Sequence, residues 1–152
     1  MSMLSYKMAE DDECVTLGSV FEDTVTRYPD NIMLLFEGRH WTYAEFNAEV
    51  NRLAHLLGER GVGRGDTVAI FMENRAEFVL CMLALVKLGA SASLINNSLG
   101  GAALVHCINA TDSTRCLVGE ERATVLAEVL DELDLVAARA SFWVPHPGDS
   151  SA

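Results

Sequence analysis

Apolar residues in the first third of the chain recur at two different spacings. From Leu17 to Tyr28 they return every three or four positions, which predicts a helix that Pro29 ends. Apolar runs over 32–36 and 40–42 flank a turn at 37–39, so they predict a small hairpin. Thr42 and Glu45 then have the spacing of a capping box, which opens a second amphipathic helix that Gly61 ends.

From residue 67 onward, short apolar runs alternate with helical patterns. We expect strands over 68–72, 91–95, 115–118 and 140–144, and helices over 75–88, 99–110 and 122–138. Strands separated by helices indicate parallel crossovers. The predicted fold class is therefore α/β: an N-terminal helix and small hairpin, followed by a mostly parallel βαβαβαβ layer. We divide the chain into an acidic lead-in (1–15), one domain (16–144) and a polar tail (145–152).

Composition fits a soluble globular domain and argues against nucleic-acid binding. Half of the 152 residues are hydrophobic, and 22 acidic residues against 11 basic ones give a formal charge of −11. Such a surface repels phosphate backbones, and no basic stripe offsets that repulsion. The acidic residues of 10–13 stand where a secretory leader would need an apolar stretch. We therefore expect a cytoplasmic protein, with reduced cysteines that serve as core residues.

Several polar segments of the sequence are candidate ligand sites. The glycine cluster 61–65 precedes a strand instead of opening a helix, so we expect a turn and not a phosphate loop. Glu73 and Asn74 follow the first central strand, where open α/β sheets bind ligands, but Asn74 is better explained as a helix cap. The same interpretation applies to Asn97 and Ser98 after the next strand. We predict no catalytic, cofactor-binding or metal-binding residue in this chain.

Metal and membrane sites were considered as well. His106, Cys107 and Cys116 lack a fourth partner at zinc spacing, and His40, His55 and His146 show no arrangement that suggests a catalytic triad. The segment 78–95 carries one charge, Lys87, and approaches the length of a membrane span. Small residues at 89–93 interrupt it, so a buried helix followed by a buried strand explains it better. Reversible peripheral membrane association stays open as a minor alternative.

A succession of short phrases adds a more specific signal. In order, the chain reads TYAE (42–45), NRLA (51–54), GVGRGDTVA (61–69), ENRAEF (73–78) and LVKLGA (85–90). Together, in this order, they resemble the N-terminal part of the adenylate-forming, AMP-binding enzymes. The phrases FEGR (36–39) and IN (95–96), with the segment 99–109, look most like the long-chain and very-long-chain acyl-CoA synthetases of the fatty acid transport protein group. The resemblance spans about residues 16–120.

The resemblance implies a ligase that activates a fatty acid with ATP to an acyl adenylate and then transfers the acyl group to coenzyme A, with Mg²⁺ serving the nucleotide. The family's T-S-G-T-T-G-x-P-K phosphate loop, Y-G-x-T-E motif, ribose-binding Asp, hinge and C-terminal catalytic Lys have no match in these 152 residues. Because adenylyl transfer depends on donors and cations positioned around the phosphates, we expect the chain alone to be inactive.

Our leading hypothesis is therefore an N-terminal fragment of a fatty-acyl-CoA synthetase, either a truncated gene product or an engineered piece. We keep two alternatives: a stand-alone, non-catalytic α/β module that binds a partner or an acyl ligand, and a fragment of an amino-acid-activating adenylation domain. A sheet that continues into missing strands would leave an open edge, so we also expect self-association through that edge.

Overall fold

The computed structural model describes residues 15–135 and 141–144, and of residues 141–143 only the backbone. The predicted lead-in up to residue 14, the segment 136–140 and the tail 145–152 lie outside the described residues, as do Cys14 and His146. The chain begins with helix α1 (Leu17–Arg27), the hairpin strands β1 (Ile32–Phe36) and β2 (Arg39–Thr42), and helix α2 (Tyr43–Glu59). The helix, hairpin and second helix predicted from the pattern are confirmed, with ends that differ by one or two residues.

Local sequence explains both the hairpin and the helix that follows it. Glu37 and Gly38 form the two-residue turn, with φ of 49° and 79°, the left-handed values that a tight hairpin turn requires. At the start of α2, the Thr42 hydroxyl accepts from the N–H of Glu45, and the Glu45 carboxylate accepts from the N–H of Thr42. This is the predicted capping box.

The second half of the described chain builds one parallel sheet. Its strands are β3 (Thr67–Phe71), β4 (Ser91–Leu94), β5 (Arg115–Gly119) and β6 (Ser141–Val144), in the order β4-β3-β5-β6. Every neighbouring pair is parallel, with Val68 opposite Ala92 on one side and Arg115 on the other. The doubly wound arrangement expected from the alternation is thus observed, with β3 at its centre.

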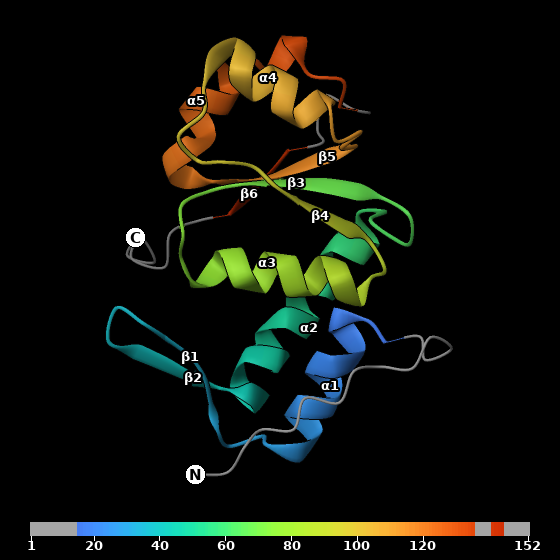
Figure 1. Cartoon of the computed structure of the whole chain (residues 1–152), viewed down its shortest axis with the longest axis vertical. Helices are drawn as coiled ribbons and strands as arrows, with labels where there is room; N and C mark the ends of the chain where they lie inside the picture. Colours follow the sequence, from blue (N-terminus) through green and yellow to red (C-terminus); the bar gives the residue numbers. More distant parts are fainter. Residues whose placement is uncertain (1–14, 136–140, 145–152) are drawn as a thin grey trace.

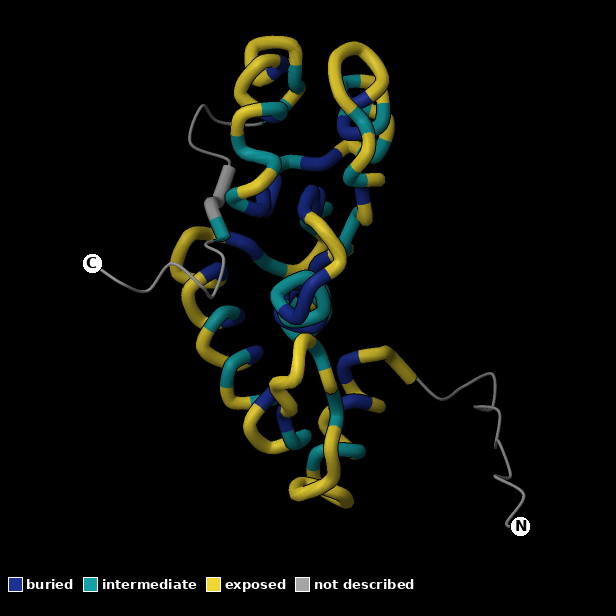
Figure 2. The backbone as a smooth tube through the Cα atoms, turned by 90° about the vertical axis from the view of Figure 1, so that its left-hand side faces the viewer, coloured by how far each residue is buried: buried dark blue, intermediate teal, exposed yellow. Residues whose placement is uncertain are grey.

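Helices cover both faces of this sheet (Figure 1). Helix α3 (Ala76–Lys87) lies between the sheet and the pair α1 and α2, whereas α4 (Gly101–Asn109) and α5 (Ala123–Ala127) lie on the opposite face. The buried side chains accordingly form two clusters, one around Phe46, Leu57 and Leu85 and the other around Phe71, Leu104 and Ile108. In Figure 2, buried backbone runs through the middle of the molecule, and both ends of the long axis are exposed.

The helix predicted over 122–138 is the one element that the structure contradicts. The segment is a 3₁₀ turn (Glu120–Arg122), the short α5, and a second 3₁₀ turn (Leu130–Glu132). Its apolar stripe still packs, since Leu126 and Val129 are buried. The β-branched residues Thr124, Val125 and Val129 weaken helix propagation, so tertiary packing holds the stripe without a continuous helix. Residues 136–138 of that prediction lie outside the described residues.

The apolar stretch 78–95 and the glycine cluster 61–65 each have the structure that the sequence analysis favoured. The apolar stretch 78–95 is the greater part of α3 followed by β4. Across the described ranges, no helix combines the length and the apolar character that crossing a bilayer demands. The glycine cluster is a turn that leads from α2 into β3: Gly61 and Gly65 have φ of 80° and 89°, and the Asp66 carboxylate accepts from the N–H of Gly63 at 2.9 Å.

Candidate functional site at the carboxyl end of the sheet

Ligands of open parallel sheets bind beside the carboxyl ends of the strands. Three polar segments lie there in this protein: 73–75 after β3, 96–98 after β4, and 120–122 after β5. The first and third are joined to one another and to the end of β6 by a network of carboxylates and guanidinium groups. Of the ligand candidates that the sequence suggested, Glu73 belongs to this network.

Glu121 is folded back over the end of β3. Its Oε1 accepts from the backbone N–H of Glu73 at 2.8 Å. The carboxylate fills the space beside Gly119, the last residue of β5: a Cβ at position 119 would lie 2.6 Å from both Glu121 Oε2 and Met72 Cβ. Only glycine therefore fits at the point where β5 ends and the chain turns.

Arg75 is the buried member of the network, with 6% of its surface exposed. Its Nη2 donates to the carbonyl of Val144 at 2.9 Å and lies 3.7 Å from Glu121 Oε2, while its Nε lies 3.8 Å from Glu77 Oε2. Burying a guanidinium is costly unless it is paired, and two carboxylates and a carbonyl supply that pairing. One side chain thus connects the β3–α3 junction to the end of β6 and to the turn after β5.

The outer part of the network is a more exposed pair. Arg122 Nη2 donates to Glu73 Oε1 at 2.9 Å.

The surroundings of Glu121 keep its carboxyl group ionised. Burial raises the pKa of Glu121. The N–H groups of Glu73 and of Glu121 itself, together with the charges of Arg75 and Arg122, outweigh burial and hold this pKa below its usual range. Glu121 is thus an ion-pairing carboxylate at neutral pH and not a proton donor.

The caps predicted after the two strands are wrong. The N-cap of α3 is Arg75 and not Asn74, and no side chain caps that helix. The N-cap of α4 is Gly100, two residues beyond Ser98. Asn96 instead closes a local turn, its Oδ1 accepting from the N–H of Ser98 at 2.9 Å. The polar side chains of 96–98 thus form hydrogen bonds within the loop before α4 and do not cap the helix.

A mostly apolar groove of about 250 Å³ adjoins Arg75, between β1 and the start of α3. Leucine, phenylalanine, alanine and valine form most of its wall, with Asn74 and Arg75 as its polar members. The residues that line it are Leu34, Phe36, Asn74, Arg75, Ala76, Phe78 and Val79. Sequence reasoning missed this groove because its two walls come from elements that are distant in the chain.

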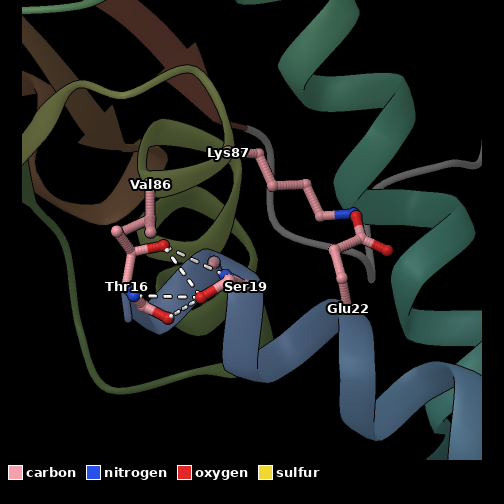
Figure 3. Close-up of a pocket in the computed structure, with 6 residues that line it drawn as sticks. Thr16, Ser19, Glu22, Val86 and Lys87 are labelled. Carbon is pink, nitrogen blue, oxygen red and sulfur yellow. Dashed lines mark hydrogen bonds and ion pairs between the residues drawn. The ribbon is translucent and has the colours of Figure 1, made fainter. Parts of the chain in front are cut away.

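A second, more polar hollow of about 300 Å³ lies where α1 meets α3 (Figure 3). Thr16 and Ser19 on its rim form a reciprocal cap of α1. Lys87 contacts Glu22 of α1 and Asn47 of α2, and its Nζ donates to Asn51 Oδ1 at 2.7 Å. Because these partners occupy the hydrogen-bonding positions of the Lys87 ammonium, we interpret the hollow as the packing junction of α1, α2 and α3 and not as a ligand site.

The metal and nucleophile candidates lie apart in the structure. Cys81 and Cys116 are buried, which raises the pKa of each thiol to about 12. His40, His55 and His106 are exposed. Over residues 15–135 and 141–144, no three His, Cys, Asp or Glu side chains gather as metal ligands would. The absence of catalytic, cofactor-binding and metal-binding residues from this chain stays a prediction.

The comparisons place this α/β fold among the AMP-binding enzymes. A family model for "AMP-binding enzyme" matches residues 21–147, and the chain belongs to this family. Among curated relatives, it is 36% identical over 121 residues to the medium/long-chain fatty acid–CoA ligase FadD6 of Mycobacterium tuberculosis and 37% identical over 120 residues to long-chain fatty acid transport protein 1 of Bos taurus. These alignments cover 80% and 78% of this chain, and the chain spans about a fifth of either relative.

Solved structures give the same fold. The N-terminal domain of FACL13 from Mycobacterium tuberculosis superposes with a TM-score of 0.72 at 25% identity, covering 85% of this chain and 33% of that one. For O-succinylbenzoate coenzyme A synthetase of Bacillus subtilis, in complex with AMP, the TM-score is 0.64 at 31% identity, with 66% and 26% covered. The NpsA N-terminal subdomain of Klebsiella oxytoca gives 0.68 at 28% identity, with 72% and 28% covered.

Proposed function

We propose that this chain is the N-terminal scaffold of a long-chain fatty acid–CoA ligase. The observation that carries the proposal is the family match over residues 21–147, together with relatives whose names specify fatty acid–CoA ligation and fatty acid transport. In the proposed parent enzyme, ATP activates a fatty acid to an acyl adenylate with release of pyrophosphate, and the acyl group passes to coenzyme A. Fatty acid and coenzyme A are thus the partners of that enzyme.

Within this scheme, the chain supplies strands and helices and no reacting group. ATP needs cations and N–H donors that are free to face its phosphate oxygens, and Mg²⁺ needs free carboxylate oxygens as ligands. The described strand ends do not fit that need, because Arg75 and Arg122 face Glu121, Glu77 and Glu73 at ion-pair distance. We assign no step of the reaction to these residues, and we propose that the isolated chain is inactive.

The test of inactivity is ATP–pyrophosphate exchange with purified residues 1–152 and a long-chain fatty acid. We expect the rate of exchange to equal that of a blank without protein. Exchange above the blank that requires both fatty acid and Mg²⁺ would overturn the proposal of inactivity while leaving the family membership intact. FadD6 of M. tuberculosis, measured in parallel, shows that the assay detects activation.

A second candidate is a piece of an amino-acid-activating adenylation domain. It is favoured by the likeness to the NpsA subdomain, at 28% identity. The two candidates differ in the coding sequence that follows codon 152, because the acyl pocket lies in later parts of the family's chains. Reading that DNA for an in-frame phosphate-loop motif, and comparing the continuation with each group, separates an acyl-CoA ligase from an amino-acid-activating domain.

A third candidate is a stand-alone module that binds a partner or an acyl ligand without catalysis. The groove beside Arg75 is the feature that favours it. Titrating decanol into ¹⁵N-labelled protein tests this alternative. Saturable shifts confined to the groove residues would favour a binding module, whereas shifts spread over the surface would argue against it.

We also propose that the isolated chain self-associates through the open edge of its sheet and associates only peripherally with membranes. On β4, the outer edge strand, Leu94 is 53% exposed. Strand edges pair with other chains unless charge or proline blocks them, and β4 carries neither. Sedimentation velocity of wild type and Leu94→Lys tests the edge. Self-association that persists in Leu94→Lys would exclude β4 as the interface between copies of the chain.

Co-sedimentation of the protein with anionic vesicles tests the proposed peripheral association with membranes.

A further inference from the structure

The side chain of Glu121 accepts a hydrogen bond from Glu73, just after β3, and pairs with Arg75, whose guanidinium donates to the last residue of β6. We propose that Glu121 is an acid-sensitive latch: as a carboxylate it holds Arg75 against the last carbonyl of β6, and protonation of Glu121 releases that end of β6. The released state keeps the rest of the sheet intact. This inference is independent of the proposed enzymatic function.

The latch rests on a chain of three contacts. Glu121 Oε1 is fixed to β3 by the N–H of Glu73 at 2.8 Å, which sets the position of the whole carboxylate. Its Oε2 then lies 3.7 Å from Arg75 Nη2, and the same nitrogen donates to the Val144 carbonyl at 2.9 Å. The absence of a side chain at Gly119 leaves the space that the carboxylate occupies. Glu121 therefore orients the donor that grips the end of β6.

The charges around Glu121 come from three directions within the described residues. Arg75 lies at the start of α3, where Glu77 is its other carboxylate partner; Glu73, paired with Arg122, follows β3; and Glu120 and Arg122 belong to the same turn as Glu121. Glu73 is engaged by Arg122 at 2.9 Å, so the nearest cation left to balance Glu121 is Arg75. When Glu121 becomes neutral, Arg75 loses one of its compensating carboxylates while it stays buried.

The direction of the pH response follows from the folded-state pKa. Burial raises the pKa of Glu121, but the N–H groups and the two arginines outweigh burial, so the pKa lies below the ordinary 4.5. A group with a lowered folded pKa contributes stability that is present above the ordinary value and lost as the pH falls through the folded value. The latch is thus closed at neutral pH and opens in acid below about pH 4.5.

Release is local because β6 and β3 are held very differently. Among the described residues, β6 is an edge strand of four residues that pairs with β5, whereas β3 pairs with strands on both sides and its residues 68–71 are fully buried. Segments held by fewer interactions open locally, with a smaller free energy than global unfolding. The end of β6 at Val144 is held by β5 and by the hydrogen bond from Arg75, so it opens more readily once that bond weakens.

Amide hydrogen exchange by NMR on the full chain tests the latch. Protection factors of the β6 amides that pair with β5 are compared with those of β3 at pH 7, 5 and 3.5. In wild type, we expect β6 protection to fall as the pH is lowered below 4.5, while β3 protection falls less. In Glu121→Gln, which mimics the protonated acid, β6 protection should be low already at pH 7 and change little with pH. Glu128→Gln removes an exposed carboxylate at the end of α5 and should behave as wild type.

Two outcomes would overturn the proposal. One is wild-type protection that falls equally in β6 and β3, which means that acid unfolds the sheet as a unit. The other is Glu121→Gln with wild-type β6 protection at every pH. If Glu121→Gln is unfolded, its β3 amides are unprotected as well, and the pH series on wild type still decides between local and global release.

Discussion

Thr42 and Glu45 cap the start of α2 reciprocally, the Thr42 hydroxyl accepting from the Glu45 N–H at 3.2 Å and the Glu45 carboxylate accepting from the Thr42 N–H at 2.9 Å. Removal of an N-cap hydroxyl costs about 1 kcal/mol. We expect Thr42→Ala to lower the free energy of unfolding by this amount, measured by urea denaturation. Thr26→Ala, which removes an exposed hydroxyl near the C-terminal end of α1, is the control and should change stability little. Equal losses in both variants would contradict the capping role.

The same cap makes α2 sensitive to acid. The N–H and hydroxyl of Thr42 lower the pKa of Glu45 from its ordinary 4.5. Because the folded pKa is lowered, the stabilisation is present above pH 4.5 and is lost as the pH falls through the folded value. We expect the stability difference between wild type and Glu45→Gln to shrink below pH 4.5, followed by urea unfolding at several pH values. A difference that is constant from pH 7 to 3 would refute this linkage.

Gly119 and Gly63 form a matched pair for a test of packing. A Cβ at position 119 would lie 2.6 Å from Met72 Cβ, whereas a Cβ at position 63 meets nothing within 4 Å. Overpacking costs about 1–3 kcal/mol. Gly119→Ala should therefore destabilise the protein by this amount, and Gly63→Ala should not, as read from thermal and urea unfolding. Wild-type stability of Gly119→Ala would show that the Glu121 side chain moves aside at no cost.

Lys87 is expected to matter more than a surface lysine. Its ammonium contacts Glu22, Asn47 and Asn51, and lies 5.4 Å from the centre of the Phe21 ring. Hydrogen bonds to charged groups contribute about 1.5–3 kcal/mol, so Lys87→Met should cost about that much. Arg27→Met, which breaks the exposed pair with Asp23, should cost less than about 1 kcal/mol. Similar losses of stability in the two variants would mean that the Lys87 contacts contribute no more than an exposed surface ion pair.

Thiol labelling distinguishes the cysteines. Burial raises the pKa of Cys81 and Cys116 to about 12, so neither forms an accessible thiolate near pH 8. Cys107 is only partly buried. In a Cys14→Ser background, we expect Cys107 to react with Ellman's reagent far faster than the other two, which should react at the rate of unfolding. Adding Cys107→Ser should abolish the fast phase, and a fast phase that survives it would contradict this assignment.

Local signals predicted most of the fold. The Thr42–Glu45 spacing, the Glu37–Gly38 turn and the alternation after residue 67 each depend on residues close in sequence, and each is confirmed. The helix over 122–138 was wrong because a continuous apolar stripe does not require a continuous helix when packing holds it. Capping by Asn74 and Ser98 was wrong because the helices begin one or two residues later, at the N-caps Arg75 and Gly100, and residue type alone does not fix where a helix begins.

The network at the carboxyl end could not be predicted from the sequence. Arg75, Glu121 and Val144 come from three segments that only the strand order brings together. Glu73 was considered as a ligand residue, and the structure instead shows it paired with Arg122. Such pairings depend on the strand order and on how far one strand extends past another. The hydrophobic periodicity of the sequence indicates neither of these.

Helix α3 is enclosed by the sheet on one side and by α1 and α2 on the other, so it has little surface in contact with water. A substitution in α3 must therefore suit two partners at once, whereas one on the outer side of α4 needs to suit only the solvent. Over evolutionary time, the segment 76–87 should vary more slowly than 101–109, and compensating changes should appear in pairs on either side of it. The centre of the scaffold is thus the part of the chain with the least freedom to diverge.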